Sequence, residues 1–159
     1  MTQCYLGLGS NLRVPKRQLR QAIASLRTLP RSTLARQSSI YLSKPLGVRA
    51  QPSYCNMVVT IKTSLPIKNL LHYCQSIENK QQRTRKAHWG ARTLDIDILL
   101  YGNKSINLHD ITIPHPQMLK RDFVLIPLNE VAPFARLPNG KLINTYLTSC
   151  KKHVISIHH

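Results

Sequence analysis

Acidic residues are scarce in this sequence of 159 residues. Six Asp and Glu stand against 23 Lys and Arg, which gives a formal net charge of +17. Such an excess attracts polyanions, whether nucleic acid, an acidic membrane or a phosphate-rich small molecule, and composition does not separate these partners. Basic residues scattered between Arg13 and Arg36 are typical of a solvated surface, whereas those clustered between residues 80 and 92 suggest a ligand.

Long apolar runs and clustered cysteines are also missing. No run reaches the roughly 18 apolar residues of a membrane span, and the N-terminus lacks the basic stretch and apolar block of a signal peptide. The four cysteines (Cys4, Cys55, Cys74 and Cys150) form no CxxC and no zinc-binding spacing. We therefore expect reduced core thiols in a cytoplasmic protein with no membrane partner.

The length and the hydrophobic content of 42% fit one globular domain over residues 1–159, with no repeat and no linker. Apolar spacing and turn residues predict the elements. Strands are expected at about 3–8, 33–43, 54–61 and 93–101, with 106–113 pairing back. Helices are expected from Pro15, from Pro66, from Asp122 as N-cap, and over about 142–150. Strands and helices intermix with short links, which predicts an α+β fold, a ferredoxin-like sandwich of a mainly antiparallel sheet flanked by helices.

Two of the six carboxylates lie in the segment Leu94-Asp-Ile-Asp-Ile-Leu-Leu100. Because strand side chains alternate, Asp95 and Asp97 share one face while Ile96 and Ile98 point into the core. Two carboxylates held side by side repel unless a cation bridges them, and Mg²⁺ prefers such hard oxygen ligands. The alternative is an exposed strand edge with two solvated aspartates. The basic surroundings favour the metal site.

Arginines crowd the stretch that leads into this strand. Arg83, Arg85, Lys86 and Arg92 fall within ten positions, with Trp89 among them. Guanidinium groups match phosphate oxygens, and phosphoryl transfer needs metal and cationic groups together. The same residues could equally bind a nucleic-acid backbone while Trp89 stacks on a base.

Two further segments supply candidate ligand contacts. Residues 113–123 bring His115, Arg121 and Phe123 into one compact turn-to-helix segment. Tyr54 and Asn56 lie two apart on a predicted strand, so they share a face and offer an aromatic wall beside an amide. This combination suits a flat heterocycle with donor and acceptor edges, although a core tyrosine and a structural asparagine are the simpler explanation for the pair alone.

Taken in order and spacing, these motifs resemble the 6-hydroxymethyl-7,8-dihydropterin pyrophosphokinase family over nearly the whole chain. The matching residues are Gly9-Ser10-Asn11, Pro45-Leu46-Gly47, Tyr54-x-Asn56, Gly90-Ala-Arg-Thr-Leu-Asp-Ile-Asp-Ile-Leu99, Pro114-His115-Pro116 and Arg121-x-Phe123. The resemblance implies transfer of pyrophosphate from ATP to the hydroxymethyl group of the pterin, with release of AMP, in folate biosynthesis. It also implies two Mg²⁺ ions and a monomer.

The resemblance implies roles for individual residues. Asp95 and Asp97 would hold the metal ions and, with Arg83 and Arg92, act in catalysis. The pterin would contact Ser43, Pro45, Leu46, Tyr54, Asn56, Trp89 and Phe123. ATP would contact Gln75, Glu78, Arg85, Trp89, Arg92, Ile98, Thr112, His115 and Arg121.

Two alternatives from other classes stay open at this point. A basic nucleic-acid-binding module would explain the charge but not the paired aspartates. A two-metal nucleotidyl transferase could use the aspartates and would release pyrophosphate instead of AMP.

Overall fold

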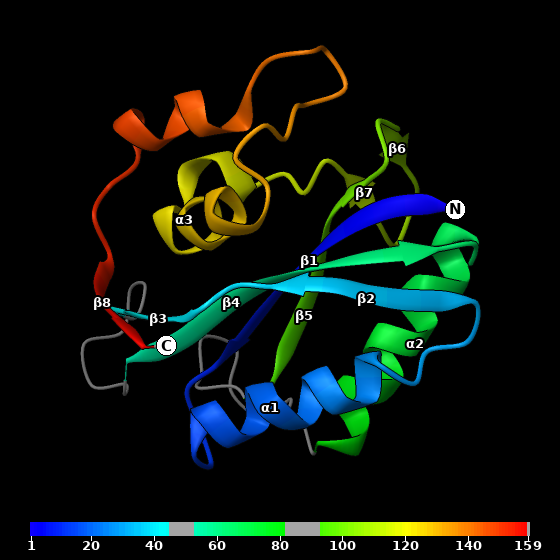
Figure 1. Ribbon diagram of the computed structural model, residues 1–159, viewed down its shortest axis with the longest axis horizontal. Helices are drawn as coiled ribbons and strands as arrows, with labels where there is room; N and C mark the ends of the chain where they lie inside the picture. The colour runs from blue at the N-terminus through cyan, green and yellow to red at the C-terminus, as the bar shows by residue number, and fades with distance from the viewer. Residues whose placement is uncertain (45–52, 82–92, 159) are drawn as a thin grey trace.

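A six-stranded antiparallel sheet forms the centre of the protein (Figure 1), seen in a computed structural model that describes residues 1–44, 53–81 and 93–158. Its order is β5-β1-β4-β3-β8, and β2 also pairs with β4. The strands are β1 (Thr2–Ser10), β2 (Ser32–Gln37), β3 (Ile40–Ser43), β4 (Tyr54–Thr63), β5 (Asp95–Tyr101) and β8 (Val154–His158).

Helices cover both faces of this sheet. Helices α1 (Pro15–Leu26) and α2 (Ile67–Lys80) lie on one face, and α3 (Asp122–Val131) lies on the other (Figure 1). With β2 and β3 sharing one position, the order β1-α1-β2/β3-β4-α2-β5 and the sheet order match a ferredoxin-like sandwich. The predicted fold class is confirmed.

The apolar periodicity explains which helix faces are buried. Leu19, Ala22, Ile23 and Leu26 of α1 are buried with Leu70, Cys74 and Ile77 of α2 against strands β1, β4 and β5. A second cluster on the opposite face joins Leu125, Leu128 and Val131 of α3 to Val58, Leu99 and Leu100. Cys4, Cys55 and Cys74 are buried free thiols, as expected.

The predicted strand at 33–43 is interrupted, which corrects the sequence interpretation. The structure has two strands, β2 and β3, and both pair with β4. At the break, the Ser38 hydroxyl accepts a hydrogen bond from the Val58 amide at 2.9 Å, and the Ser38 amide donates to the Val58 carbonyl. A side-chain oxygen thus replaces a backbone carbonyl in the ladder, which lets the chain change direction.

Two other expected elements differ in kind. Residues 106–113 form their own two-stranded sheet, in which β6 (Ile106–Asn107) pairs with β7 (Thr112–Ile113) instead of returning onto β5. The segment expected as a helix over 142–150 is the 3₁₀ helix η2 (Ile143–Ser149), and a shorter one, η1 (Met118–Lys120), precedes α3.

The C-terminal region holds an element that the sequence did not predict. Strand β8 pairs antiparallel with β3, from Ile40 opposite His158 to Ser43 opposite Val154. Asp122, expected as an N-cap, is instead the first residue of α3, and Arg121 stands at the N-cap position. The carboxylate of Asp122 accepts hydrogen bonds from the amides of His153 and Val154.

Within the described ranges, none of the helices has both the length and the apolar character that a bilayer crossing requires.

Candidate active site

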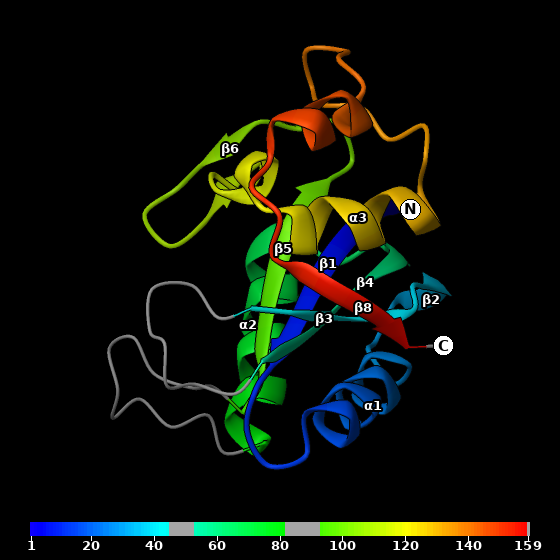
Figure 2. The same cartoon turned by 90° about the vertical axis from the view of Figure 1, so that its left-hand side faces the viewer.

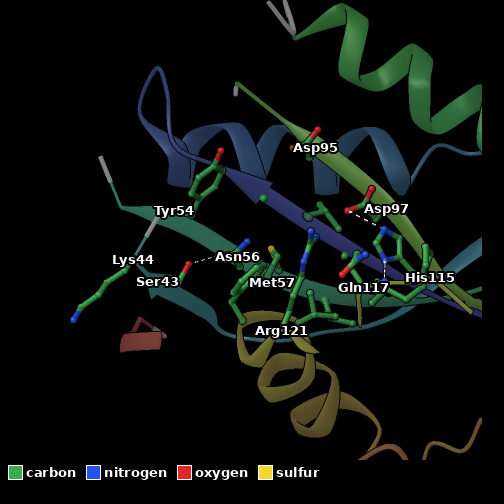
Figure 3. Close-up of a pocket in the computed structure, with 18 residues that line it drawn as sticks. Ser43, Lys44, Tyr54, Asn56, Met57, Asp95, Asp97, His115, Gln117 and Arg121 are labelled. Atoms are coloured by element: carbon green, nitrogen blue, oxygen red, sulfur yellow. Dashed lines mark hydrogen bonds and ion pairs between the residues drawn. The ribbon is translucent and has the colours of Figure 1, made fainter. Parts of the chain in front are cut away.

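A cleft of about 540 Å³ opens on the sheet face that α3 only partly covers (Figure 3). Gly7 and Gly9 of β1 form part of its floor, and the lack of side chains there leaves the hollow open. The carboxylates of β5 lie at one end, and Ser43, Tyr54 and Asn56 lie toward the other (Figure 3). The full lining comprises Gly7, Leu8, Gly9, Ser43, Lys44, Tyr54, Asn56, Met57, Val58, Asp95, Asp97, Leu99, His115, Pro116, Gln117, Arg121, Phe123 and Val124.

Strand β5 presents both aspartates to this cleft, as its alternation predicts. Asp95 and Asp97 line it, while Ile96 and Ile98 are buried in the core on the face covered by α1 and α2. The Asp97 side chain is 49% exposed, so its carboxylate is open to a ligand. From the opposite face, the buried Glu78 accepts a hydrogen bond from the Ile96 amide at 2.9 Å. Helix α2 thereby fixes the strand between the two aspartates.

His115 reaches the carboxylate end from the turn after β7. Its amide donates to the Leu99 carbonyl at 3.0 Å, which anchors the turn to β5. Its Nδ1 accepts a hydrogen bond from the Gln117 amide at 3.2 Å, so the proton of the neutral ring is on Nε2. Nε2 lies 3.9 Å from Asp97 Oδ2. The histidine therefore directs a donor toward the aspartate end of the cleft.

Burial lowers the pKa of His115, and the nearby Arg121 lowers it further, against the opposing pull of Asp97. The ring is therefore neutral at pH 7. A neutral histidine with a proton on Nε2 can donate one hydrogen bond to an anionic oxygen in the cleft.

Arg121 and Phe123 flank the start of α3. The guanidinium carbon of Arg121 lies 5.7 Å from the centroid of the Phe123 ring, close enough for a cation–π contact. Both side chains line the cleft, and the guanidinium group of Arg121 places a permanent positive charge there.

The other end of the cleft combines an amide with aromatic and hydroxyl groups. The Ser43 hydroxyl donates to Asn56 Oδ1 at 2.8 Å, which orients the buried carboxamide. Gly9 approaches the same group so closely that a Cβ there would stand 2.9 Å from Asn56 Nδ2. Burial raises the pKa of Tyr54, and Asp95 raises it further, so its hydroxyl stays protonated and able to donate.

The carboxylate pair fits a divalent cation that shares its coordination shell with phosphate oxygens. Among the residues that the structure describes, no group of three or more His, Cys, Asp or Glu could hold a metal ion by itself. Two aspartates on one strand face are nevertheless the kind of partial ligand set that Mg²⁺ uses beside substrate phosphates.

Most of the scarce carboxylates have a defined place in the structure. No Asp or Glu precedes Glu78 in the sequence. Asp95 and Asp97 line the cleft, Glu78 holds β5, and Asp122 and Glu130 tie α3 to its neighbours. Asp110 is exposed. With six Asp and Glu against 23 Lys and Arg, the protein carries a formal net charge of +17, which favours the approach of an anionic ligand.

The structure gathers many of the predicted site residues, but not all of them. Ser43, Tyr54, Asn56, Asp95, Asp97, His115, Arg121 and Phe123 line one cleft. The predicted contacts Pro45, Leu46, Arg83, Arg85, Trp89 and Arg92 lie outside the described residues.

Four predicted ATP contacts lie elsewhere in the described part of the chain. Gln75 is exposed on α2, Thr112 is exposed on β7, Ile98 is in the core, and Glu78 is buried beneath β5. None of the four lines the cleft.

Sequence reasoning missed several lining residues. Gly7 and Met57 lie in segments whose pattern predicts a strand and indicates no ligand contact. Lys44 and Gln117 are single polar residues beside motif positions. The spacing Gly7-x-Gly9 on one strand face was the available signal, because glycines there leave room for a ligand.

The fold and the cleft define an α+β protein in which a carboxylate, histidine and arginine end adjoins an aromatic and amide end. A profile of the 7,8-dihydro-6-hydroxymethylpterin-pyrophosphokinase (HPPK) family matches residues 5–133. The chain belongs to this family, as its motifs predicted.

Individual relatives agree over most of the chain. A 2-amino-4-hydroxy-6-hydroxymethyldihydropteridine pyrophosphokinase from Haemophilus influenzae is 45% identical over 153 residues, covering 96% of each chain. The protein of that name from Pseudomonas aeruginosa is 42% identical and covers 92% of this chain and 90% of its own. The one from Bacillus subtilis is 45% identical over 127 residues, covering 80% of this chain and 76% of its own.

Solved structures support the fold. An HPPK-DHPS protein in complex with substrates superimposes with a TM-score of 0.75 at 13% identity, covering 93% of this chain and 43% of that one. Plasmodium falciparum HPPK-DHPS with pteroate gives 0.73 at 13% identity, covering 93% and 42%. The chain spans less than half of those longer proteins, and at this identity the likeness concerns fold alone.

Proposed function

We propose that this protein transfers pyrophosphate from ATP to the hydroxymethyl group of 6-hydroxymethyl-7,8-dihydropterin, releasing AMP, in folate biosynthesis. The composition of the cleft carries the proposal. It joins a carboxylate pair suited to a metal–phosphate group with an amide and aromatic pocket suited to a flat heterocycle. The chain is also 45% identical, over 96% of its length, to a pyrophosphokinase of this type.

The pterin end is expected to recognise both the faces and the edge of the ring. Tyr54 and Phe123 offer aromatic surfaces from different elements, β4 and α3. Asn56 would read the polar edge of the heterocycle, and the hydrogen bond from Ser43 keeps its carboxamide in one orientation. Such preorganisation lowers the entropic cost of binding.

The phosphate end would receive the ATP chain. We propose that Asp95 and Asp97 hold two Mg²⁺ ions against its phosphates. Bound Mg²⁺ polarises phosphoryl oxygens and lowers the pKa of a coordinated hydroxyl. Arg121 would neutralise charge on the phosphate chain, and His115 would donate its Nε2 proton to a phosphate oxygen without giving it up.

The reaction then depends on positioning. The pterin hydroxymethyl oxygen would attack the β-phosphorus, with AMP as leaving group, when the two ends of the cleft hold both substrates in line. Arg83, Arg85, Trp89 and Arg92 stay predicted contacts of the phosphate chain on the family resemblance.

Product analysis tests the proposal. Purified protein should form AMP from ATP only when the pterin and Mg²⁺ are both present. Asp97→Ala should lower kcat/KM by about a thousandfold, or roughly 4 kcal/mol, because a ligand of the metal is lost. The matched control is Asp110→Ala, which removes an exposed carboxylate outside the cleft and should change the rate less than about twofold.

Three results would contradict the proposal. Pyrophosphate release in place of AMP would indicate a nucleotidyl transferase. Nucleic-acid binding at physiological salt without pterin binding would indicate a binding module. Near-normal turnover by Asp97→Ala would refute the metal assignment.

A further inference from the structure

The C-terminal segment joins two walls of the cleft that do not belong to the same element. One wall is the start of α3 with Phe123, and the other is the end of β3 with Ser43. Figure 2 shows the segment descending past α3 and continuing as β8 beside β3. Residues 153 and 154 lie where these parts meet.

On the α3 side, the contact is made by a buried carboxylate. Asp122 is 5% exposed, and its Oδ2 accepts hydrogen bonds from the His153 amide at 2.8 Å and the Val154 amide at 3.0 Å. His153 Nδ1 lies 3.4 Å from the other carboxylate oxygen. Asp122 does not line the cleft, although its neighbours Arg121 and Phe123 do.

On the β3 side, the same residues bond to the strand. The His153 carbonyl accepts a hydrogen bond from the Lys44 amide at 2.8 Å, and Val154 is the register partner of Ser43. The register of β8 against β3 shifts between Leu42 and Ser43, and Ser43 opposite Val154 is the last pair of the ladder. The end of β3 is therefore held by the pairing of Ser43 with Val154 and by the hydrogen bond of Lys44, the next residue, to His153.

The His153 ring completes the connection. It packs edge-on against Phe123, with centroids 6.0 Å apart and planes at 89°. The ring of Phe123 thus contacts the same residue whose backbone bonds to Asp122 and to Lys44 at the end of β3. A displaced C-terminal segment would release both Phe123 and the end of β3.

We propose that Asp122 is a positioning residue for the pterin end of the cleft, acting through residues 153 and 154 to set the distance between Phe123 and Ser43. We call the contacts of Asp122, His153, Val154 and Lys44 the C-terminal latch. The inference rests on the proposed function only for the identity of the ligand.

The chain offers a matched control on the same pair of elements. Glu130 also ties α3 to the β3 region, because its carboxylate accepts hydrogen bonds from the Ser39 amide at 3.0 Å and from the Tyr41 hydroxyl at 2.5 Å. It lies eight residues further along α3, about 12 Å from Asp122 at 1.5 Å per residue. Loss of Glu130 should weaken the packing of α3 without moving Phe123.

Steady-state kinetics with each substrate varied tests the role. Asp122→Ala should raise the KM for the pterin about tenfold (about 1.4 kcal/mol) while kcat and the KM for ATP change less than about twofold. Asp122→Asn keeps one oxygen for the two amides and should give an intermediate KM. Glu130→Gln should lower the melting temperature but leave the pterin KM within about twofold of wild type. An unchanged pterin KM in Asp122→Ala, or an equal rise in Glu130→Gln, would overturn the proposal.

Amide exchange tests the latch without relying on turnover. In Asp122→Asn without ligand, the Lys44 amide should exchange at least about tenfold faster, while the Ser38 amide, bonded to Val58, should not change. Equal exchange of Lys44 in both proteins would refute the latch. Absence of AMP formation by wild type would instead refute the proposed function.

A measurement on wild-type protein covers the case in which both Asp122 variants fail to fold. Saturating pterin should slow exchange of the Val154 amide more than that of the Ser39 amide, because pterin binding and the contacts of the C-terminal latch stabilise each other. Equal slowing of the two amides would overturn the proposal.

Discussion

Substitution of Glu78 tests whether this side chain holds strand β5 or contacts ATP, because the structure indicates the first role and the family resemblance the second. The resemblance implies a contact with ATP, whereas the buried side chain bonds to the Ile96 amide between the two aspartates. Glu78→Ala leaves that buried amide without its acceptor, which costs about 1–3 kcal/mol. The missing side-chain volume adds to this, so we expect a total loss of about 2–4 kcal/mol in the free energy of unfolding.

Urea unfolding measures this loss directly. The transition midpoint should fall with an unchanged slope, and the melting temperature should drop by roughly 5–15 °C for a chain of this size. The matched control is Gln75→Ala, one turn earlier and exposed on the same helix, which should stay within about 0.5 kcal/mol of wild type. A Glu78→Ala variant as stable as wild type, but with ATP binding weakened tenfold or more, would show that the side chain serves the nucleotide and not the strand.

Two further outcomes follow from the cleft. Gly9→Ala places a methyl group 2.9 Å from Asn56 Nδ2, so the carboxamide must shift. Initial-rate measurements should show a pterin KM raised about tenfold. An unchanged KM would contradict the close approach of Gly9 to Asn56. Burial, with help from Arg121, holds the pKa of His115 below its usual 6.5 despite Asp97. The unfolded chain therefore binds this proton more readily, and stability should fall as the pH drops below about 6.5. Urea unfolding at about pH 7.5 and about pH 5.5 should show a smaller loss in His115→Gln, and an equal loss in both proteins would be the contrary result.

Local patterns in the sequence were enough for the main elements and for the orientation of the paired aspartates. The period of two in Asp95-Ile-Asp97 requires both carboxylates to share a face, whatever lies on either side of the strand. Helical spacing in the same way fixes the buried stripes of α1 and α2. The motif residues Tyr54, Asn56, His115 and Arg121 were recognised by their order along the chain, and the fold brings them into one cleft.

The hydrogen-bond partners of several polar side chains were decided only by the tertiary structure. Glu78 and Ile96 are 18 positions apart, and Asp122 and Val154 are 32 apart, so no local pattern predicts their bonds. Ser38 likewise interrupts a strand because its hydroxyl meets Val58 across the sheet. A strand or helix period states which residues share a face, but only the stacking of the elements determines whether that face meets solvent, a cleft or a buried amide in need of an acceptor.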